Sequence, residues 1–440
     1  MRWPNLKEGD SRVHIQPNDT PLQLVEKHHW NALYLLSALC LILMTLALGT
    51  QTLFLSSVLN ISVANAGAIN ANIMVLCEML ELVVAGTVGY LSDRVGRKRI
   101  MVQGFLLAGV GAVMAPFSTV IEGLFGGGGL TFYYLSRLVI AAGIGSVWPQ
   151  LAAIGGDFTD HDNRPRLMVN SVFMMALGKT LVYGILMQIP QIGGVILTML
   201  LIAVAAFAGA QLAETCLIDV GPRLRQSAFP WRRIHRLWKD ERRLRVSFAT
   251  AFLARSDMVI TALFLMMWCI YSAKRAGVTG EEAAAHAGLL IGLAGVVVML
   301  SIPFWKAFIE HYGRIPAIAA SLALSGLGFI LMVLVGNPLD WFVMLPVTVT
   351  AAGQTGCFVT PSILAIDLTP PDMRGSLLGA FNIVGGIGQV FFIQIGGILF
   401  DAMGPASPFI FVGLANLVVM AYAISVMNSP RDRPAAEKGT

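Results

Sequence analysis

The sequence predicts an all-α integral membrane protein with twelve transmembrane helices, arranged as two six-helix bundles related by a pseudo-two-fold axis. Three observations predict this fold: an apolar composition, a one-sided distribution of basic residues, and loop motifs that recur half a chain apart. The 440 residues are 56% hydrophobic and only 12% charged. Soluble domains carry about 25% charged residues, and a soluble chain this apolar would lack polar side chains to cover its surface. Lipid is therefore the expected solvent for most of the chain.

Long apolar runs supply the predicted spans. A helix needs about 20 apolar residues to cross the hydrocarbon core. The runs do not alternate with a period of two, which favours helices over a barrel. The first run is too long for a cleavable signal peptide and is expected to remain as a span. The predicted spans are 31–59, 68–92, 99–120, 131–156, 166–189, 192–213, 246–271, 284–307, 315–336, 340–367, 375–400 and 407–427.

Lysine and arginine residues orient these spans. With the N-terminus in the cytoplasm, one face holds 25 of the 30 basic residues and the other holds only Lys274 and Arg275. Because basic loops stay cytoplasmic, both termini are predicted to lie in the cytoplasm of a bacterium, with the chain in its inner membrane. The predicted divisions are an N-tail, a first bundle, a central loop, a second bundle and a C-tail, at 1–30, 31–213, 214–245, 246–427 and 428–440.

The basic central loop has two interpretations. It is either a linker containing a surface helix on anionic lipid or a docking site for a cytoplasmic partner. A nucleic-acid partner is not expected, because the basic residues occupy short loops between apolar segments.

Two loop motifs recur in the same order in both halves of the chain. The stretch from Asp157 to Arg164 is echoed, at an offset of 210, by the stretch from Asp367 to Arg374. A second stretch, 93–97, is echoed by 310–314 at an offset of 217. This pattern predicts duplication of a six-span unit, as in one large class of transporters.

The loop after the second span contains a motif, Gly89-Tyr-Leu-Ser-Asp-Arg-Val-Gly-Arg-Lys98. It resembles the signature of the major facilitator superfamily, G-x-x-x-D-R-x-G-R-K/R. A glycine in it permits a tight turn, and its aspartate can lie near the positive end of a helix. In that family the motif is a conformational latch on the cytoplasmic side. The latch residues so implied are Gly89, Asp93, Arg94, Gly96, Arg97 and Lys98, with a weaker copy at Glu310, Gly313 and Arg314.

This resemblance covers about residues 31–427 and implies a secondary transporter. Its two bundles would enclose a central cavity that opens alternately to either side. Transport of a small solute would be coupled to protons or to a solute gradient. No P-loop, H-E-x-x-H or nucleophile-elbow motif occurs, so neither an enzyme nor a cofactor is expected.

Six charged residues lie well inside the predicted spans, away from their ends, where charge is costly and normally functional. They are Glu78, Glu81 and Asp257, and the bases Arg137, Lys179 and Arg255. Arg137 partly matches the family's second signature, an arginine followed by spaced glycines. Such carboxylates can carry protons or bind cations such as Fe²⁺, so the three acids are the metal candidates. The alternative is an internally neutralised set, with Arg137 paired to Glu78. The uncharged candidates for lining the cavity are Gln354, Asn382 and Gln389.

Two further stretches, 14–30 and 255–264, resemble the magnetosome-associated members of this superfamily in magnetotactic bacteria. That group is implicated in iron supply for magnetite formation, which would place the chain in the magnetosome membrane. Three hypotheses remain. The cargo is iron, as ion or complex; or it is an organic anion bound by Lys179 and Arg137; or the chain is a scaffold or sensor that transports nothing.

Overall fold

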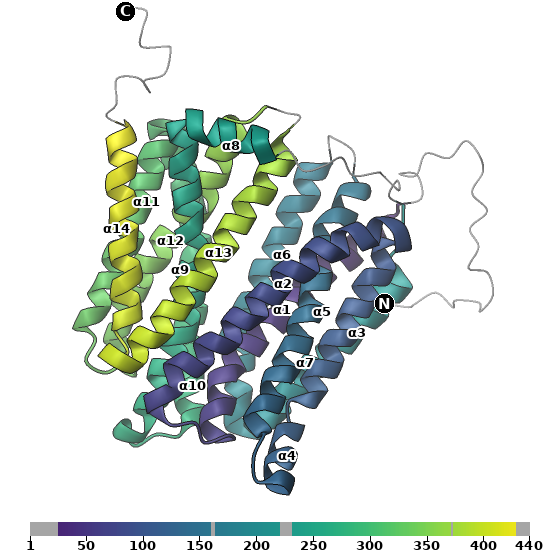
Figure 1. Ribbon diagram of the computed structural model, residues 1–440, viewed down its shortest axis with the longest axis vertical. Coiled ribbons are helices and arrows are strands. Elements are labelled where there is room, and N and C mark those ends of the chain that lie inside the picture. Colours follow the sequence, from purple (N-terminus) through teal and green to yellow (C-terminus); the bar gives the residue numbers. More distant parts are fainter. Residues whose placement is uncertain (1–24, 160–162, 221–230, 371–372, 428–440) are drawn as a thin grey trace, which may run out of the picture.

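The computed structural model describes residues 25–159, 163–220, 231–370 and 373–427, and within these ranges the regular structure is helical (Figure 1). Most helices run side by side along one direction, as spans of a membrane do. The first half contains α1 Lys27–Ser57, η2 Val63–Asn65, α2 Ala66–Val95, α3 Arg97–Met114, α4 Phe117–Phe125, α5 Gly129–Asp157, α6 Arg164–Gly184, η3 Leu186–Gln188 and α7 Ile189–Cys216.

The second half repeats this all-helical pattern after a short connecting helix. That helix is α8, Trp231–Asp240, which lies across the ends of the longer helices (Figure 1). The second half contains α9 Arg242–Ala276, α10 Gly280–Tyr312, α11 Arg314–Leu331, η4 Met332–Leu334, η5 Trp341–Val343, α12 Met344–Asp367, α13 Arg374–Met403 and α14 Ser407–Met427.

Ten helical stretches of the described residues are long and apolar enough to cross a membrane, or eleven if the bent pair α3 and α4 forms one span. The predicted spans 166–189 and 192–213 fall in a single 51-residue stretch from Arg166 to Cys216, which includes α6, η3 and α7. At about 1.5 Å per residue, a 51-residue helical stretch is long enough to cross a core about 30 Å thick twice, although it counts as one stretch here. The twelve crossings and the cytoplasmic termini stay predictions.

The turn after the second long helix of each half has the same construction. Gly96 separates α2 from α3 with a φ of 107°, and Gly313 separates α10 from α11 with a φ of 88°. Residues with a Cβ avoid these values, whereas glycine adopts them readily. The recurring glycine of the duplicated motif thus places two equivalent turns.

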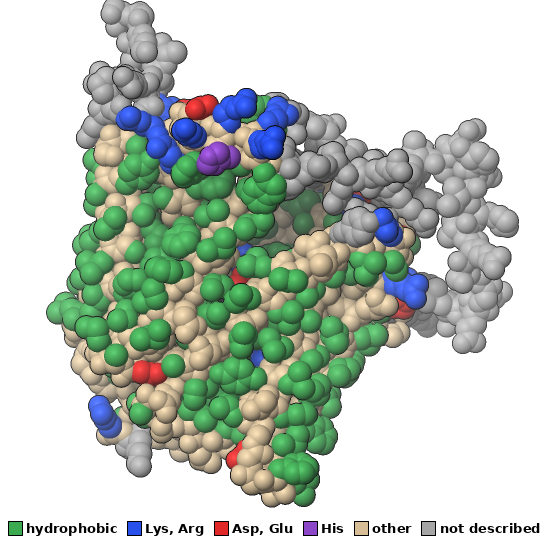
Figure 2. Space-filling view, in the orientation of Figure 1, with side chains coloured by type: hydrophobic (Ala, Val, Ile, Leu, Met, Phe, Trp, Pro, Cys, Tyr) green, Lys and Arg blue, Asp and Glu red, His purple; other side chains and the backbone are tan. Residues whose placement is uncertain are grey.

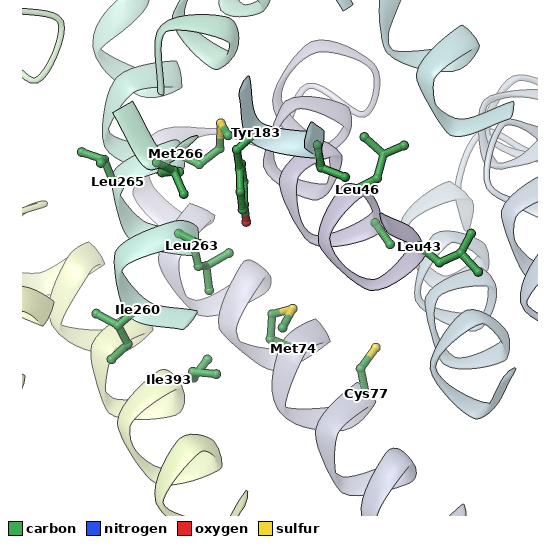
Figure 3. Packing of buried hydrophobic residues seen from close by; sticks show 14 of the residues in the cluster. Leu43, Leu46, Met74, Cys77, Tyr183, Ile260, Leu263, Leu265, Met266 and Ile393 are labelled. Atoms are coloured by element: carbon green, nitrogen blue, oxygen red, sulfur yellow. The ribbon is translucent and has the colours of Figure 1, made fainter. Parts of the chain in front are cut away.

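Each half packs mainly within itself. In the first half α3 packs on α5 and α7, and α1 packs on α6. In the second half α11 packs on α12 and α14. The halves meet through α2 with α13, α6 with α10, and α1 with α9. Figure 3 shows side chains from both halves meeting in this shared core, including Leu46 of α1, Met74 of α2 and Leu263 of α9.

Hydrophobic side chains cover the sides of the helices, whereas lysines and arginines gather over α8 (Figure 2). We call the end that carries α8 the basic end, and the opposite end, which carries α4, the closed end. At the basic end, Ile234 of α8 is buried against the second half, while Trp231 and Trp238 stay exposed. The central loop thus contains the predicted amphipathic helix, whereas its residues 221–230 lie outside the described part. Binding of lipid or of a partner by this helix stays a prediction.

Contacts between the halves concentrate at the closed end. Both carboxylate oxygens of Asp401 accept hydrogen bonds from the first turn of α2, from Gly67 N at 2.7 Å and Ala68 N at 2.8 Å. Gln394 Nε2 donates to Asn72 Oδ1 at 2.9 Å. Toward the basic end, Figure 2 shows the surface hollowed between the two halves. The structure therefore represents a conformation sealed at the closed end.

Candidate functional site

The centre of the candidate site is a buried ion pair that joins the two halves. Glu78 of α2 is only 3% exposed, and its Oε1 lies 3.1 Å from Nη2 of Arg255 on α9. Gln389 of α13 donates its Nε2 hydrogen to Glu78 Oε2 at 2.7 Å. The carboxylate of one half is thus held by a cation and an amide of the other half. All three residues were candidates from the sequence, but the neutralised alternative paired Glu78 with Arg137, whereas the structure pairs it with Arg255.

Glu81 and Arg137 lie beside this pair around a small cavity. The cavity has a volume of about 40 Å³ and is lined by Glu78, Glu81 and Arg137 with apolar residues of α1, α2, α5 and α9. The Glu81 carboxyl group is close enough to interact electrostatically with Glu78, Arg255 and Arg137. The two glutamates, three positions apart on α2, therefore lie on one helix face. Arg137 is buried, and its Nε has no hydrogen-bond partner among the described residues.

Asp257 does not belong to this group. It lies two residues beyond Arg255 on α9, which directs the two side chains about 200° apart around the helix. Its Oδ2 accepts hydrogen bonds from Ser325 Oγ and Asn416 Nδ2, each at 3.0 Å, inside the second half. Among the described residues no group of three or more His, Cys, Asp and Glu side chains could hold a metal ion. This conformation therefore does not bring the three predicted metal candidates together.

The remaining intramembrane candidates have different surroundings. Gln354 is buried and donates to Asp257 O at 3.1 Å and to Thr261 Oγ1 at 3.0 Å, so it cross-links α12 to α9. Asn382 lies exposed on α13. Lys179 is partly buried on α6, and within the described part of the chain no charged partner faces it. Gln354 is thus structural in this conformation, whereas Lys179 remains available for an anion.

The duplicated loop motifs form equivalent ion pairs in the two halves. Arg97 Nη1 lies 2.6 Å from Asp157 Oδ2, and Arg314 Nε lies 3.0 Å from Asp367 Oδ2. In each half the arginine of the first motif thus contacts the aspartate of the second. Sequence analysis found both motifs but not their pairing.

The other latch candidates lie in the same region of the basic end. Lys98 N donates to Asp219 Oδ1 at 2.9 Å, so the start of α3 contacts the beginning of the central loop. Arg94 and Glu310 are exposed at the surface, and Gly89 lies six residues before the end of α2. The side chains of Asp93, Arg164 and Arg374 lie outside the described part of the structure, so the latch itself stays a prediction.

Four polar residues that form contacts in the structure were not among the candidates: Asn72, Ser325, Asp401 and Asn416. Asp401 follows an apolar run, which made it look like an ordinary loop acid. Asn72, Ser325 and Asn416 are uncharged and lie within spans. A search for amides, acids and hydroxyl groups inside or next to apolar runs, and not for charges alone, would have included them.

Comparison with known proteins identifies the family. The model of the Major Facilitator Superfamily matches residues 33–284 and 281–440. The magnetosome protein MamH of Paramagnetospirillum magneticum (strain ATCC 700264 / AMB-1) is 54% identical over 403 residues, which is 92% of this chain and 93% of that protein. The magnetosome protein MamZ of the same organism is 41% identical over 90% of this chain, and the match covers 62% of MamZ.

Solved structures of transporters share the fold. The nucleoside transporter NupG matches 91% of this chain and 99% of its own, with a TM-score of 0.71 and 15% identity. A POT family transporter in complex with a thioalcohol-conjugated peptide matches 93% of this chain and 99% of its own, with a TM-score of 0.73 and 14% identity. At these identities the likeness concerns the fold alone.

Proposed function

Because the chain belongs to the major facilitator superfamily, we propose that it is a secondary transporter that moves iron into magnetosome vesicles for magnetite formation. One observation carries this proposal. Two glutamates lie beside a cavity where the halves meet, and one of them is held by a cation of the opposite half. The 54% identity to a magnetosome protein supports the choice of cargo and membrane.

The ion pair suggests how cargo binding changes the conformation. Carboxylates are oxygen ligands suited to divalent first-row cations. A cation bound by Glu78 and Glu81 competes with Arg255 for Glu78, and so removes a bond between the halves. A ligand shifts a conformational equilibrium only by binding one conformation better than another. Because the cation and Arg255 compete for the Glu78 carboxylate, the cation binds a conformation without the Glu78–Arg255 pair better than the present one.

The size of the cavity favours a small cargo at this point. A volume of about 40 Å³ accommodates on the order of three water molecules, since one water needs at least about 10–15 Å³. A space of this size favours a bare or partly hydrated cation over a bulkier iron chelate in the present conformation. We therefore propose the free ferrous ion as the cargo.

We infer a direction of transport from the difference between the two ends. The structure is sealed at the closed end and hollowed toward the basic end. We propose that the basic end faces the cytoplasm, with both termini and twelve crossings as the sequence predicts. A cation then enters from the cytoplasm and leaves at the closed end, which would face the vesicle lumen.

Uptake by proteoliposomes tests this function. Purified protein would be reconstituted and supplied with radiolabelled Fe²⁺, with ferric citrate, or with labelled organic acids, with and without a pH gradient. We expect Fe²⁺ uptake to fall at least tenfold in Glu78→Gln and in Glu81→Gln. The exposed Asp240→Asn is the control and should transport normally. Iron uptake that is unchanged in both glutamate variants would refute the proposal.

One observation favours a second candidate function, the transport of an organic anion. Lys179 lies in the membrane without a charged partner in the described structure, and a buried base of this kind is a natural anion site. In that case Lys179→Gln abolishes organic-acid uptake in the same assay, while the glutamate variants retain part of it. Protein that transports neither class of cargo would support the scaffold hypothesis.

A further inference from the structure

A fully buried carboxyl group in the second half lies outside the site described above. Asp257 of α9 is 0% exposed. Its Oδ2 accepts two hydrogen bonds, from Ser325 of α11 and Asn416 of α14. Its Oδ1 accepts none in the described structure, and no salt bridge links it to a described base. Burying an ionised carboxylate without a cation costs far more than burying a neutral one.

The side-chain amide oxygen of Asn416 also lacks a hydrogen-bond partner in the described structure, and this shows which donor is missing. Asn416 is also 0% exposed, and its Oδ1 receives no hydrogen bond from the described residues, although its Nδ2 donates to Asp257. A neutral carboxyl group pairs with an amide through two hydrogen bonds, N–H···O and O–H···O. The first of these bonds is present. A proton on Asp257 Oδ1 would supply a donor for the second, for which Asn416 Oδ1 is an acceptor without a partner in the described structure.

We propose that Asp257 is a proton-binding site of the second half, formed with Ser325 and Asn416 and separate from the Glu78–Arg255 cargo site. A metal or sodium ion fits this position less well, because such ions need about six oxygen ligands and only two unsatisfied oxygens are evident on the acid–amide pair. Protonation forms one O–H bond on Oδ1 and removes one negative charge from the interior.

The groups that face Asp257 are otherwise uncharged. Ser325 and Asn416 face it from α11 and α14, and Gln354 contacts its backbone from α12. The titratable group in electrostatic contact with it among the described residues is the Cys357 thiol of α12, which bonds to a serine hydroxyl at 3.5 Å. Any titration of this pocket therefore reports either the carboxyl group or the thiol.

The position on α9 gives the proton a role in transport. The same helix holds Arg255, which bonds across to the first half, on a different face. Loss of the proton leaves an unpaired charge between α9, α11 and α14, so these helices must repack. Repacking of α9 moves the arginine that competes with the cargo. This coupling role rests on the proposed function, whereas proton binding itself does not.

Infrared spectroscopy of the purified protein tests the proton site without any cargo. We expect a carboxylic-acid carbonyl band at pH 7 that shifts in D₂O, disappears in Asp257→Asn and shifts in Asn416→Ala. Asp257→Asn should fold, because its amide can donate where the proton did. Glu78→Gln and Cys357→Ser are matched controls that should keep the Asp257 band.

Three outcomes would overturn the proposal: a spectrum unchanged in Asp257→Asn, a band that depends on Cys357 alone, or a band that sodium removes at constant pH. Proteoliposome flux then separates the two proposals. If the band behaves as expected but no iron moves in any condition, the proton site stands and the proposed function fails. If iron moves but Asp257→Asn transports with the same pH dependence as wild type, the coupling role fails alone.

Discussion

Replacing Arg255 with glutamine should shift the protein away from the conformation described here. The substitution leaves the Glu78 carboxylate 3% exposed and without its cation. Removing one partner of a buried ion pair costs about 3–5 kcal/mol. Because the Arg255 side chain is itself 35% exposed, we take the lower value, about 3 kcal/mol. That energy changes the equilibrium between conformations by roughly 150-fold, since about 1.4 kcal/mol is a factor of ten.

The double variant Glu78→Gln/Arg255→Gln should reverse most of this shift. It removes both charges of this pair, and an amide at position 78 can still bond to Gln389. Replacing both partners of a polar contact is close to neutral, so we expect the equilibrium to return to within about 1 kcal/mol of wild type. Arg242→Gln, at the exposed start of the same helix, should have no effect.

Cross-linking at the closed end measures this equilibrium. Asn72 and Gln394 face each other across the halves, with a donor–acceptor distance of 2.9 Å. Cysteines at these two positions would be joined by a short bifunctional maleimide, and the rate would report how often the closed end is sealed. Size-exclusion profiles check that each variant is folded. The effect of Arg255→Gln should shrink as pH falls, because protonation neutralises the orphaned carboxylate. Equal cross-linking rates in the single variant, the double variant and the wild type would refute this reasoning.

Three more predictions concern other contacts of the halves and their loops. Asp401→Ala removes the acceptor of two backbone N–H groups. The sealed conformation should lose about 1–3 kcal/mol of stability, which would slow cross-linking at the closed end. An unchanged cross-linking rate would contradict the assigned seal. Gly67→Val should abolish sealing, because even a Cβ at Gly67 would collide with backbone of the opposite half, and wild-type cross-linking there would count against the packing. The charge swap Arg314→Asp/Asp367→Arg should recover thermal stability that Arg314→Asp loses, by up to about 1 kcal/mol for a half-exposed pair; no recovery in a melting experiment would mean that the pair is not formed.

The helices were predictable because their signal is long and redundant. Each apolar run exceeds the thickness of the hydrocarbon core, so errors at single positions do not matter. Charge inside such a run is so costly that it marks interior positions without any knowledge of the fold. For this reason Glu78, Glu81, Arg137 and Arg255 could be identified as candidates from the sequence, and the structure places them around one point.

Their pairing could not be predicted, because it depends on how the two halves meet. Glu78 is 177 positions away from Arg255 in the chain, and Arg137 was an equally reasonable partner by charge. The spacing already predicts that Asp257 and Arg255 lie on different faces of one helix, but the packing of Asp257 against Ser325 and Asn416 was hidden for the same reason. The seal by Asp401 involves backbone N–H groups, which leave no trace in a sequence. The duplicated turns are the exception, because a glycine with positive φ is a local requirement.

Counterflow of iron tests the central claim most directly. Proteoliposomes loaded with unlabelled Fe²⁺ would be diluted into a trace of labelled Fe²⁺ without any pH gradient or voltage. A carrier that alternates between two openings exchanges cargo, so label should accumulate transiently above its outside concentration, and Glu78→Gln/Glu81→Gln should abolish that overshoot. Simple equilibration of the label, or an overshoot that persists without both glutamates, would contradict an iron carrier built on this charge cluster.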